Sequence, residues 1–518
     1  MRSRLRLGTA GLLAGVLLVT GCGSSSDTPE GESPPSSAAE AGGTIRVGVN
    51  SLPPGKGDPY KGIGSPEVYT HAAMFDALTL VDQHGKVQPA LATEWSQPSA
   101  DTWQFKLRDG VTFSNGEKFD ADVVVATYDY LLKDPEGSAS VVAADVNTVS
   151  DVKAVDPLTV EFTTAAPDAM LPARVGEVYI PAPKHFKDLG MKEFANDPVG
   201  TGPFKVDSWD SNIIKLSAFE GSWRAPKASK MEIHALPDPA GRFQALQSDQ
   251  IDLAIQLSPD QSKQLDETRA KADVVAGAQV MSLAFITELG DSPLKKKEVR
   301  QALNYAVDKE SMAKDLLLGV GKPSGSGVTD GAVGYNPDVQ PYPYDPAKAK
   351  QMLADAGYPN GFSLKADVTV GSFPADAQIY QLMQQNLADI GVEIELRQIT
   401  FAEWLEHYLK NTWTSQAFGL SWNTLPRLDA LRPMELFSCV KKPAFFCEQS
   451  VADVLGKAAK TGEMEERNKL LSQAQQMQHD DPPALYLVQQ IDINGVSSKL
   501  QGFENINRTF PYHLMSVS

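Results

Sequence analysis

Short stretches in which apolar and polar residues alternate recur in the first part of the chain. The run Thr44–Val49 alternates and is rich in β-branched residues, and Trp103–Leu107 places a large side chain on one face at every second position. A period of two is typical of half-buried strands. Asp109-Gly110 and Asn115-Gly116 follow, and such pairs favour tight turns. This part of the chain is therefore predicted to be rich in β-strands.

Further along, the apolar positions recur at helical spacing. A helix is predicted to begin at Asp345-Pro346, with a capping carboxylate and a proline in its first turn, and to end at Gly357. Helices are also predicted at 298–309 and at 376–390, and another is predicted to begin at Asp120. The apolar stripes of these helices are interpreted as core positions, and nothing in them requires a cofactor.

The spacing of strands and helices favours an α/β fold with two hinged lobes. A chain of 518 residues is too long for one ordinary core, so at least two lobes are expected. The apolar runs 279–286 and 484–493 are candidates for strands that cross between the lobes. Two hinged lobes would leave a cleft that can close around a ligand and bury most of its surface.

The first 22 residues read as an export signal. Three arginines open the chain, the apolar run 7–20 is too short and too rich in glycine to span a membrane comfortably, and Val19-Thr20-Gly21-Cys22 follows. This ending resembles a bacterial lipobox, in which Cys22 carries the lipid anchor; the alternative is an ordinary signal with an incidental cysteine. Residues 22–43 are dominated by small, acidic and proline residues, which is typical of a flexible tether. The expected location is the outer face of the cytoplasmic membrane.

The net charge and the cysteines limit the functional classes to which this protein could belong. A formal net charge of −18 argues against a nucleic-acid partner, which would favour a basic face. Cys439 and Cys447 are eight residues apart in an exported chain, and we expect them to form a disulfide. A metal site is the alternative, but no histidine lies within fifteen residues of the pair. No metal site and no cofactor are predicted, and no nucleophile motif indicates an exported hydrolase.

Several short motifs follow one another in a fixed order along the chain. They are Phe75-Asp76-Ala77-Leu78, Pro89-Ala90-Leu91-Ala92, Glu94-Trp95, the run Trp103–Val125, Val199–Phe204, Arg242–Ser248 with Ile251-Asp252, Val299–Lys309 and Ala354–Tyr358. Together they resemble the family 5 extracellular solute-binding proteins, which serve ABC importers of oligopeptides, dipeptides, nickel complexes and related solutes.

The resemblance implies a type II periplasmic-binding fold without catalysis. Lobe I would comprise 44–74, 199–277 and 488–518, with an inserted subdomain at 75–198, and lobe II would comprise 278–487. The protein would bind a small solute, most simply a peptide, as a monomer and deliver it to the permease subunits of an importer driven by an ATPase.

The resemblance also implies where the ligand lies. In peptide-binding members the ligand backbone runs between two extended segments, which map here onto Ile63, Gly64 and Ser65 and onto Ser421, Trp422 and Asn423. Such main-chain pairing accepts peptides of varied sequence. The alternative for Trp422 is an aromatic residue in the core of a lobe.

One departure from the family pattern concerns the amino group of a peptide. Many peptide binders place an aspartate three residues after the tryptophan, where it pairs with the α-ammonium, and this chain has Leu425 there. Asp429 could substitute for that carboxylate, and Arg427 could instead bind a ligand carboxylate. The alternative for Arg427 is a solvated surface residue. A non-peptide solute, such as an opine-like compound or a metal chelate, and a surface sensor of the same fold therefore remain open.

Overall fold

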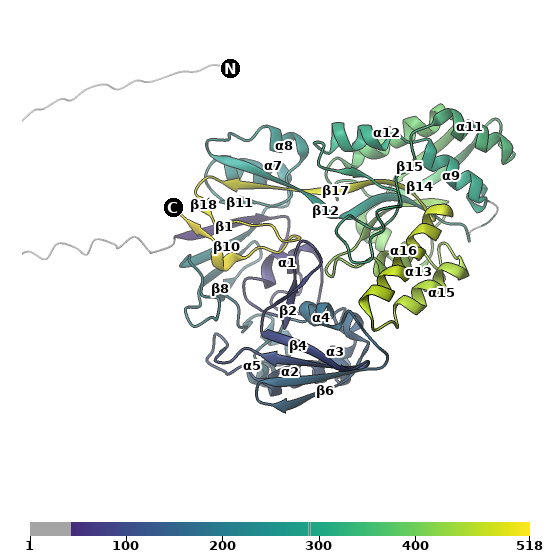
Figure 1. Cartoon of the computed structure of the whole chain (residues 1–518). Coiled ribbons are helices and arrows are strands. Elements are labelled where there is room, and N and C mark those ends of the chain that lie inside the picture. Colours follow the sequence, from purple (N-terminus) through teal and green to yellow (C-terminus); the bar gives the residue numbers. More distant parts are fainter. Residues whose placement is uncertain (1–42, 289, 291) are drawn as a thin grey trace, which may run out of the picture. The chain divides into compact units, whose positions relative to one another are not determined.

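The computed structural model describes residues 43–288, 290 and 292–518. The predicted signal segment, Cys22 and the tether up to residue 42 lie outside the described residues. The described part is a mixed α/β structure around one large sheet, with a smaller sheet beside it (Figure 1). No helix in these residues has the length and apolarity needed to cross a membrane.

The large sheet has the strand order β15-β14-β16-β12-β17-β11-β1-β10-β9-β8, and β13 pairs with β17 outside this path. Its strands are β1 (Thr44–Val49), β8 (Phe204–Trp209), β9 (Ile213–Ala218), β10 (Lys230–Ala235), β11 (Leu253–Ala254), β12 (Ala270–Phe285), β13 (Lys322–Pro323), β14 (Phe362–Val368), β15 (Val392–Gln398), β16 (Ala417–Asn423) and β17 (Ala484–Ser497).

Two long antiparallel strands, β12 and β17, run through both lobes (Figure 1). Their register shifts between Ala276 and Val280, which leaves a bulge in β12. On one side of this bulge β17 pairs with β11, and on the other side β12 pairs with β16. Both predicted crossing strands are therefore present, and each is longer than the apolar run that indicated it.

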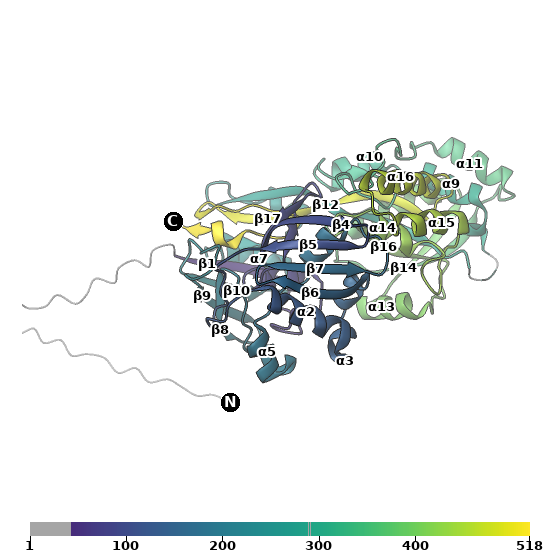
Figure 2. The same cartoon turned by 60° about the horizontal axis from the view of Figure 1, so that its bottom comes forward.

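A separate antiparallel sheet has the order β4-β5-β7-β6 and comes forward in Figure 2. Its strands are β4 (Ala92–Ser99), β5 (Thr102–Leu107), β6 (Val149–Asp156) and β7 (Thr159–Thr164), and β2 (Thr79–Val81) pairs with β3 (Val87–Pro89) nearby in the chain. Between β5 and β6 lies α2 (Ala121–Lys133), and Asp120 caps it by accepting a 3.2 Å hydrogen bond from the Val123 amide. Gly110 and Gly116 have the positive φ of the predicted tight turns.

Short helices connect these strands, and longer helices cover the second half of the chain. The helices before β12 are α1 (Ser65–His71), α3 (Pro135–Ser138), η1 (Ala143–Val146), α4 (Leu171–Arg174), η2 (Val175–Glu177), α5 (Pro183–Leu189), α6 (Met191–Phe194), α7 (Pro239–Gln247) and α8 (Pro259–Lys263). Those after β12 are η3 (Pro293–Lys295), α9 (Lys297–Tyr305), α10 (Lys309–Ser311), η4 (Met312–Leu316), α11 (Pro346–Asp355), α12 (Asp376–Asp389), α13 (Phe401–Lys410), α14 (Leu431–Leu436), α15 (Gln449–Ala458) and α16 (Met464–Asp480). The chain ends with β18 (Leu500–Gln501), η5 (Tyr512–Leu514) and β19 (Ser516–Val517).

The predicted helices are present, with one difference in length. Asp345 caps α11 through a 2.9 Å hydrogen bond from the Lys348 amide, and Gly357 takes the positive φ that ends it. The helix predicted over 298–309 stops earlier, at Tyr305. The reason is that Asp308 accepts a 3.1 Å hydrogen bond from the Ser311 amide and so starts a new turn.

Alternate residues of β12 face different cores. Met281, Leu283 and Phe285 pack with apolar side chains of α9, α11 and α12. Val280 and Ala284 point to the opposite face, into an aromatic cluster with residues of β16 and β17. The period of two in one strand thus supplies both sides of the second lobe's sheet.

The first lobe and the four-stranded sheet share one continuous apolar core, which includes Ile45, Met231, Phe105 and Phe162. This continuity is what an insertion into the first lobe would produce. We propose 44–74, 199–277 and 488–518 for lobe I, 75–198 for the subdomain and 278–487 for lobe II, because the β12 bulge between Ala276 and Val280 falls at the boundary between lobe I and lobe II.

Candidate functional site

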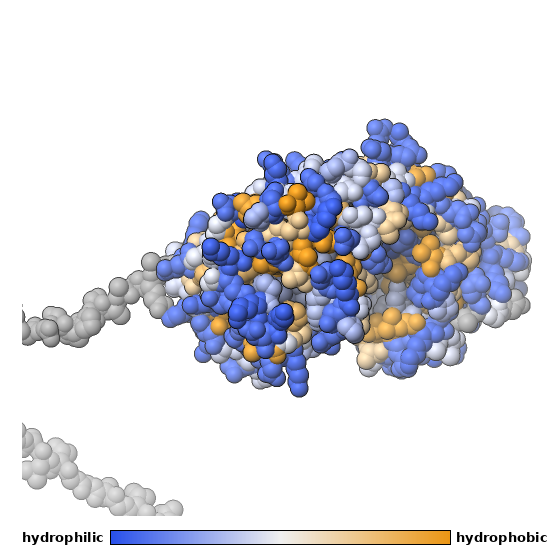
Figure 3. All heavy atoms as spheres, turned by 90° about the horizontal axis from the view of Figure 1, so that it is seen from below, coloured by the Kyte–Doolittle hydropathy of each residue, from blue (hydrophilic) through white to orange (hydrophobic). Residues whose placement is uncertain are grey.

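A cavity of about 650 Å³ lies between the lobes, within the size range of small-molecule sites. Figure 3 shows the face of the molecule toward the four-stranded sheet, where polar residues surround separate apolar patches. One wall of the cavity comes from the start of α1, from β2 and from residues 506–513 near the end of the chain, and the other comes from the end of β16 and the segment after it. The lining of the cavity includes Ile63, Gly64, Ser65, Asp76, Arg224, Gln279, Asn423, Leu425, Arg432 and Arg508.

The structure brings together four of the predicted ligand-binding residues. Ile63, Gly64 and Ser65 line the cavity where the chain enters α1, and Asn423 faces it from the end of β16. They reach the cavity from both lobes, and their role in holding a ligand between two extended segments stays a prediction.

Two ion pairs are built into the cavity wall on the first-lobe side. Asp76 Oδ1 lies 2.7 Å from Arg224 Nε, and Arg224 also donates to the carbonyls of Ala72 and Phe75. Arg508 forms a two-pronged pair with Asp492 of β17, and it donates a 3.1 Å hydrogen bond to Oε1 of Gln279 beside the β12 bulge. Arg508 therefore ties the cavity wall to both crossing strands.

Sequence reasoning did not assign these residues to the site. Asp76 belongs to one of the motifs that carry the family resemblance, so the sequence contains a signal at this position, but that signal indicates the fold and not the cavity. Arg508 lies far along the chain in a segment without a periodic pattern. Only the return of the chain end to β1 and β17 brings it to the cavity.

Trp422 lies in the core, on the face of β16 that is turned away from the cavity. Its indole is fully buried, donates a 2.5 Å hydrogen bond to Ser282 Oγ and packs 4.3 Å from the Phe437 ring, measured between ring centres. The ring also lies flat against Gly327, where an added Cβ would come within 2.3 Å of it. The alternative stated for Trp422, a core aromatic, describes its position. Ser421 does not line the cavity either.

Arg427 and Asp429 are also buried away from the cavity, because both have partners within the protein. Arg427 lies 2.9 Å from Asp145 Oδ1 and 3.0 Å from Glu177 Oε1, and so joins the second lobe to η1 and η2. Asp429 pairs with Arg467 at 2.6 Å. In this arrangement Arg427 is not a solvated surface residue, and neither Arg427 nor Asp429 lines the cavity.

Burial disfavours the charged form of Glu177, an acidic partner of Arg427. Burial raises the pKa of the Glu177 carboxyl to about 7, although Arg427 acts in the opposite direction. Neither oxygen of Glu177 accepts an aligned hydrogen bond from the described residues. The contact between Glu177 and Arg427 is thus a close ion pair without an aligned hydrogen bond.

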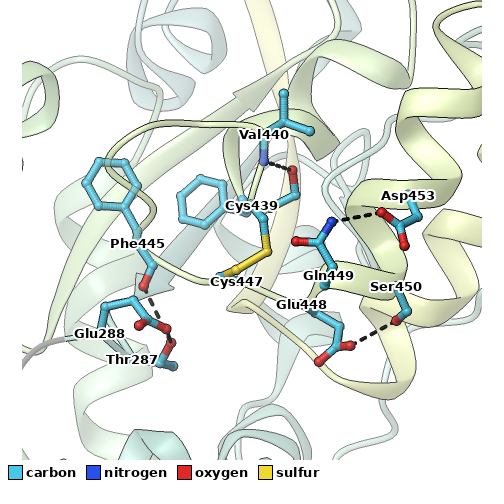
Figure 4. Close-up of a disulfide and its surroundings, with 12 residues drawn as sticks. Thr287, Glu288, Cys439, Val440, Phe445, Cys447, Glu448, Gln449, Ser450 and Asp453 are labelled. Atoms are coloured by element: carbon cyan, nitrogen blue, oxygen red, sulfur yellow. Dashed lines mark hydrogen bonds between the residues drawn. A yellow bond between two sulfur atoms is a disulfide. The ribbon is translucent and has the colours of Figure 1, made fainter.

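Cys439 and Cys447 form a disulfide, the pairing predicted from their spacing (Figure 4). The bond closes a loop next to the aromatic cluster of the second lobe, to which Phe445 and Phe446 contribute. Phe445 also accepts a 3.0 Å hydrogen bond through its carbonyl from the Thr287 amide at the end of β12. The disulfide therefore fixes a loop that packs on the core and lies outside the cavity.

The fold and the cavity define a two-lobed solute-binding protein. Residues 86–436 match the model of the bacterial extracellular solute-binding proteins, family 5. The glutathione-binding protein GsiB of Escherichia coli K12 is 25% identical over 467 residues, which cover 86% of this chain and 89% of that protein.

Solved structures share the fold at lower identity. The periplasmic binding protein DppA of Helicobacter pylori, in complex with the peptide STSA, matches with a TM-score of 0.77 at 23% identity, covering 92% of this chain and 99% of that one. AgaA of A. tumefaciens R10, in complex with agropinic acid, matches with a TM-score of 0.74, the same identity and the same coverage. CtaP of Listeria monocytogenes matches with a TM-score of 0.82 at 21% identity over 92% and 99% of the two chains.

The family match covers well over half of the chain. The protein belongs to family 5 of the bacterial extracellular solute-binding proteins.

Proposed function

We propose that this protein is the lipid-anchored binding subunit of an ABC importer and that it delivers a peptide or a related small solute to the permease. The observation that carries the proposal is the cavity between the lobes, lined from both sides by polar groups in a family 5 fold. A ligand bound there would contact both lobes at once and would favour the closed arrangement. The anchor is proposed from the lipobox-like sequence that ends at Cys22.

Binding of a solute should raise the thermal stability of the full chain. A ligand present at a hundred times its dissociation constant adds about 2.7 kcal/mol to the free energy of unfolding. The measurement is a thermal-shift screen with di- to hexapeptides, reduced glutathione, mannopinic and agropinic acids and nickel chelates. If only non-peptide solutes stabilise the protein, the peptide assignment is wrong. If no solute in the screen stabilises it, the importer proposal is wrong.

Anchoring through Cys22 should be lost in a Cys22→Ser variant expressed in a bacterium that makes lipoproteins. Each buried methylene of an acyl chain contributes about 0.8 kcal/mol, so two chains hold a protein firmly, and their loss should move the protein from the membrane fraction to the soluble fraction. The control is the double variant Cys439→Ser and Cys447→Ser, which keeps Cys22 and should stay with the membrane. A Cys22→Ser protein that still sediments with membranes would contradict the anchor.

A further inference from the structure

The wall of the cavity that the second lobe supplies carries hydrogen-bond donors without protein partners. Asn423 accepts a 2.9 Å hydrogen bond from the Leu425 amide through its side-chain oxygen, which fixes the orientation of the amide group. Its Nδ2 is then a donor, and it makes no hydrogen bond to any residue that the structure describes. A ligand acceptor is the partner that this group requires in a closed cavity.

Arg432, on the first turns of α14, is the second donor on this wall. Its side chain is 38% exposed, and the carboxylate nearest to it is Asp145 at 3.9 Å. That carboxylate already binds Arg427 at 2.9 Å. The Arg432 guanidinium has no hydrogen bond within the described part of the chain, whereas Arg224 and Arg508, the other arginines that line the cavity, each hold a carboxylate of their own.

The carboxylate of the cavity wall already has partners within the protein. Among the described residues that line the cavity, Asp76 is the one carboxylate. Arg224 lies 2.7 Å from its Oδ1, and its Oδ2 accepts hydrogen bonds from Thr201 at 2.8 Å and from Trp223 at 2.9 Å. None of the described residues that line the cavity therefore offers a free carboxylate to a ligand ammonium group, and a buried charge without a partner is costly.

We propose that the solute of this cavity is anionic, that Arg432 and Asn423 bind its carboxylate, and that it needs no free α-ammonium group. The inference rests on the proposed function, since it names the chemistry of the solute for that same cavity. A planar guanidinium can bind a carboxylate through two parallel hydrogen bonds, and the Asn423 amide adds a third donor. The apolar part of the solute would lie against Ile63 and Leu80, both of which line the cavity and are partly exposed.

The test compares four forms of one library of tri- and tetrapeptides with uncharged side chains: free, N-acetylated, C-terminally amidated, and blocked at both ends. Mannopinic acid and reduced glutathione are included as anionic non-library probes. Affinities for the full chain are measured by isothermal titration calorimetry. Acetylation is expected to change the affinity by less than about threefold, whereas amidation is expected to weaken it by at least about tenfold, the loss typical of a charge-assisted hydrogen bond.

Substitution of the arginine should remove this preference. In Arg432→Gln the acid and the amide are expected to bind within about threefold of each other, and in Arg432→Lys part of the preference should remain because the charge is kept. Arg269→Gln is the matched control, because Arg269 is an exposed arginine outside the cavity, and it should bind as the unsubstituted protein does. The melting temperature of each variant establishes that it is folded.

Two results would overturn the inference in different ways. Solutes that bind with equal affinity as acid and amide, or that bind Arg432→Gln as well as the unsubstituted protein, would refute the anionic assignment while leaving the solute-binding function intact. The absence of binding by any probe to the unsubstituted protein would refute the proposed function and the anionic assignment together.

Discussion

Replacing Arg427 by methionine should lower the free energy of unfolding by about 3–5 kcal/mol at pH 8, because it leaves the buried carboxylates of Asp145 and Glu177 without their cation. Methionine fills a similar volume, so the loss reports mainly on the charge. The measurement is denaturant-induced unfolding of the ligand-free protein. The exposed Arg269, replaced in the same way, is the matched control and should change stability by less than about 0.5 kcal/mol.

The loss at Arg427 should depend on pH with a defined sign. The folded-state pKa of Glu177, about 7, lies above its usual value of 4.5, so the folded protein holds this proton more tightly than the unfolded chain. Stability from this carboxyl is therefore lost as the pH rises through about 7. Removal of Arg427 raises the same pKa further, because the cation no longer favours the charged form. The gap between the unsubstituted protein and Arg427→Met should widen from pH 5 to pH 8.

Neutralising the acidic partners provides the complementary test. In the triple variant Arg427→Met, Asp145→Asn and Glu177→Gln, no uncompensated charge is left, and most of the lost stability should return. Arg174 and Arg432, which also act on Glu177, stay unchanged in this comparison. If the triple variant is as unstable as the single variant, packing of the Arg427 side chain is the cause, and the electrostatic account fails.

Truncating Trp422 to alanine should lower the free energy of unfolding by about 3–5 kcal/mol, as expected for a large buried aromatic residue. The cavity that it leaves faces Gly327, Phe437 and Tyr486, and none of these has a side chain that can fill the space. Unfolding by denaturant measures the change. Ser282→Ala, which removes only the hydrogen-bond partner of the indole, is expected to cost about 1 kcal/mol.

The conservative variant Trp422→Phe separates a core role from a ligand contact. It keeps most of the packing and loses the indole N–H, so it should be moderately destabilised while its affinity for any solute found in the thermal screen stays within about threefold. A loss of affinity of about tenfold or more in a protein that is still folded would place Trp422 at the ligand, contrary to its position in the core.

Local patterns in the sequence were sufficient to predict these helices and strands, because each of them depends on residues that are close together in the chain. The caps Asp120 and Asp345 and the alternation in Thr44–Val49 act over a few residues and need no knowledge of the fold. The same holds for the paired cysteines, whose short separation limits the loop that they can close.

Site residues were harder to assign, because their roles depend on partners far away in the sequence. Arg427 and Asp145 are 282 positions apart, and nothing near either residue indicates the other. Trp422 is a different case, since the alternation of β16 was visible. Trp422 and Asn423 are adjacent in a strand and therefore face opposite sides, so they could not both have lined one cavity. Applying the period of two to this segment would have separated Trp422 from Ser421 and Asn423, which share the other face.

The bulge in β12 limits how the two lobes can move. On both sides of it β12 stays paired with β17, so any sliding of one lobe past the other would have to break this ladder at many points. Bending at the irregular step between Ala276 and Val280 breaks none of them. We therefore expect the two lobes to open and close about one hinge at this bulge. Gln279 lies in the hinge and also lines the cavity, so a bound solute can contact the hinge directly.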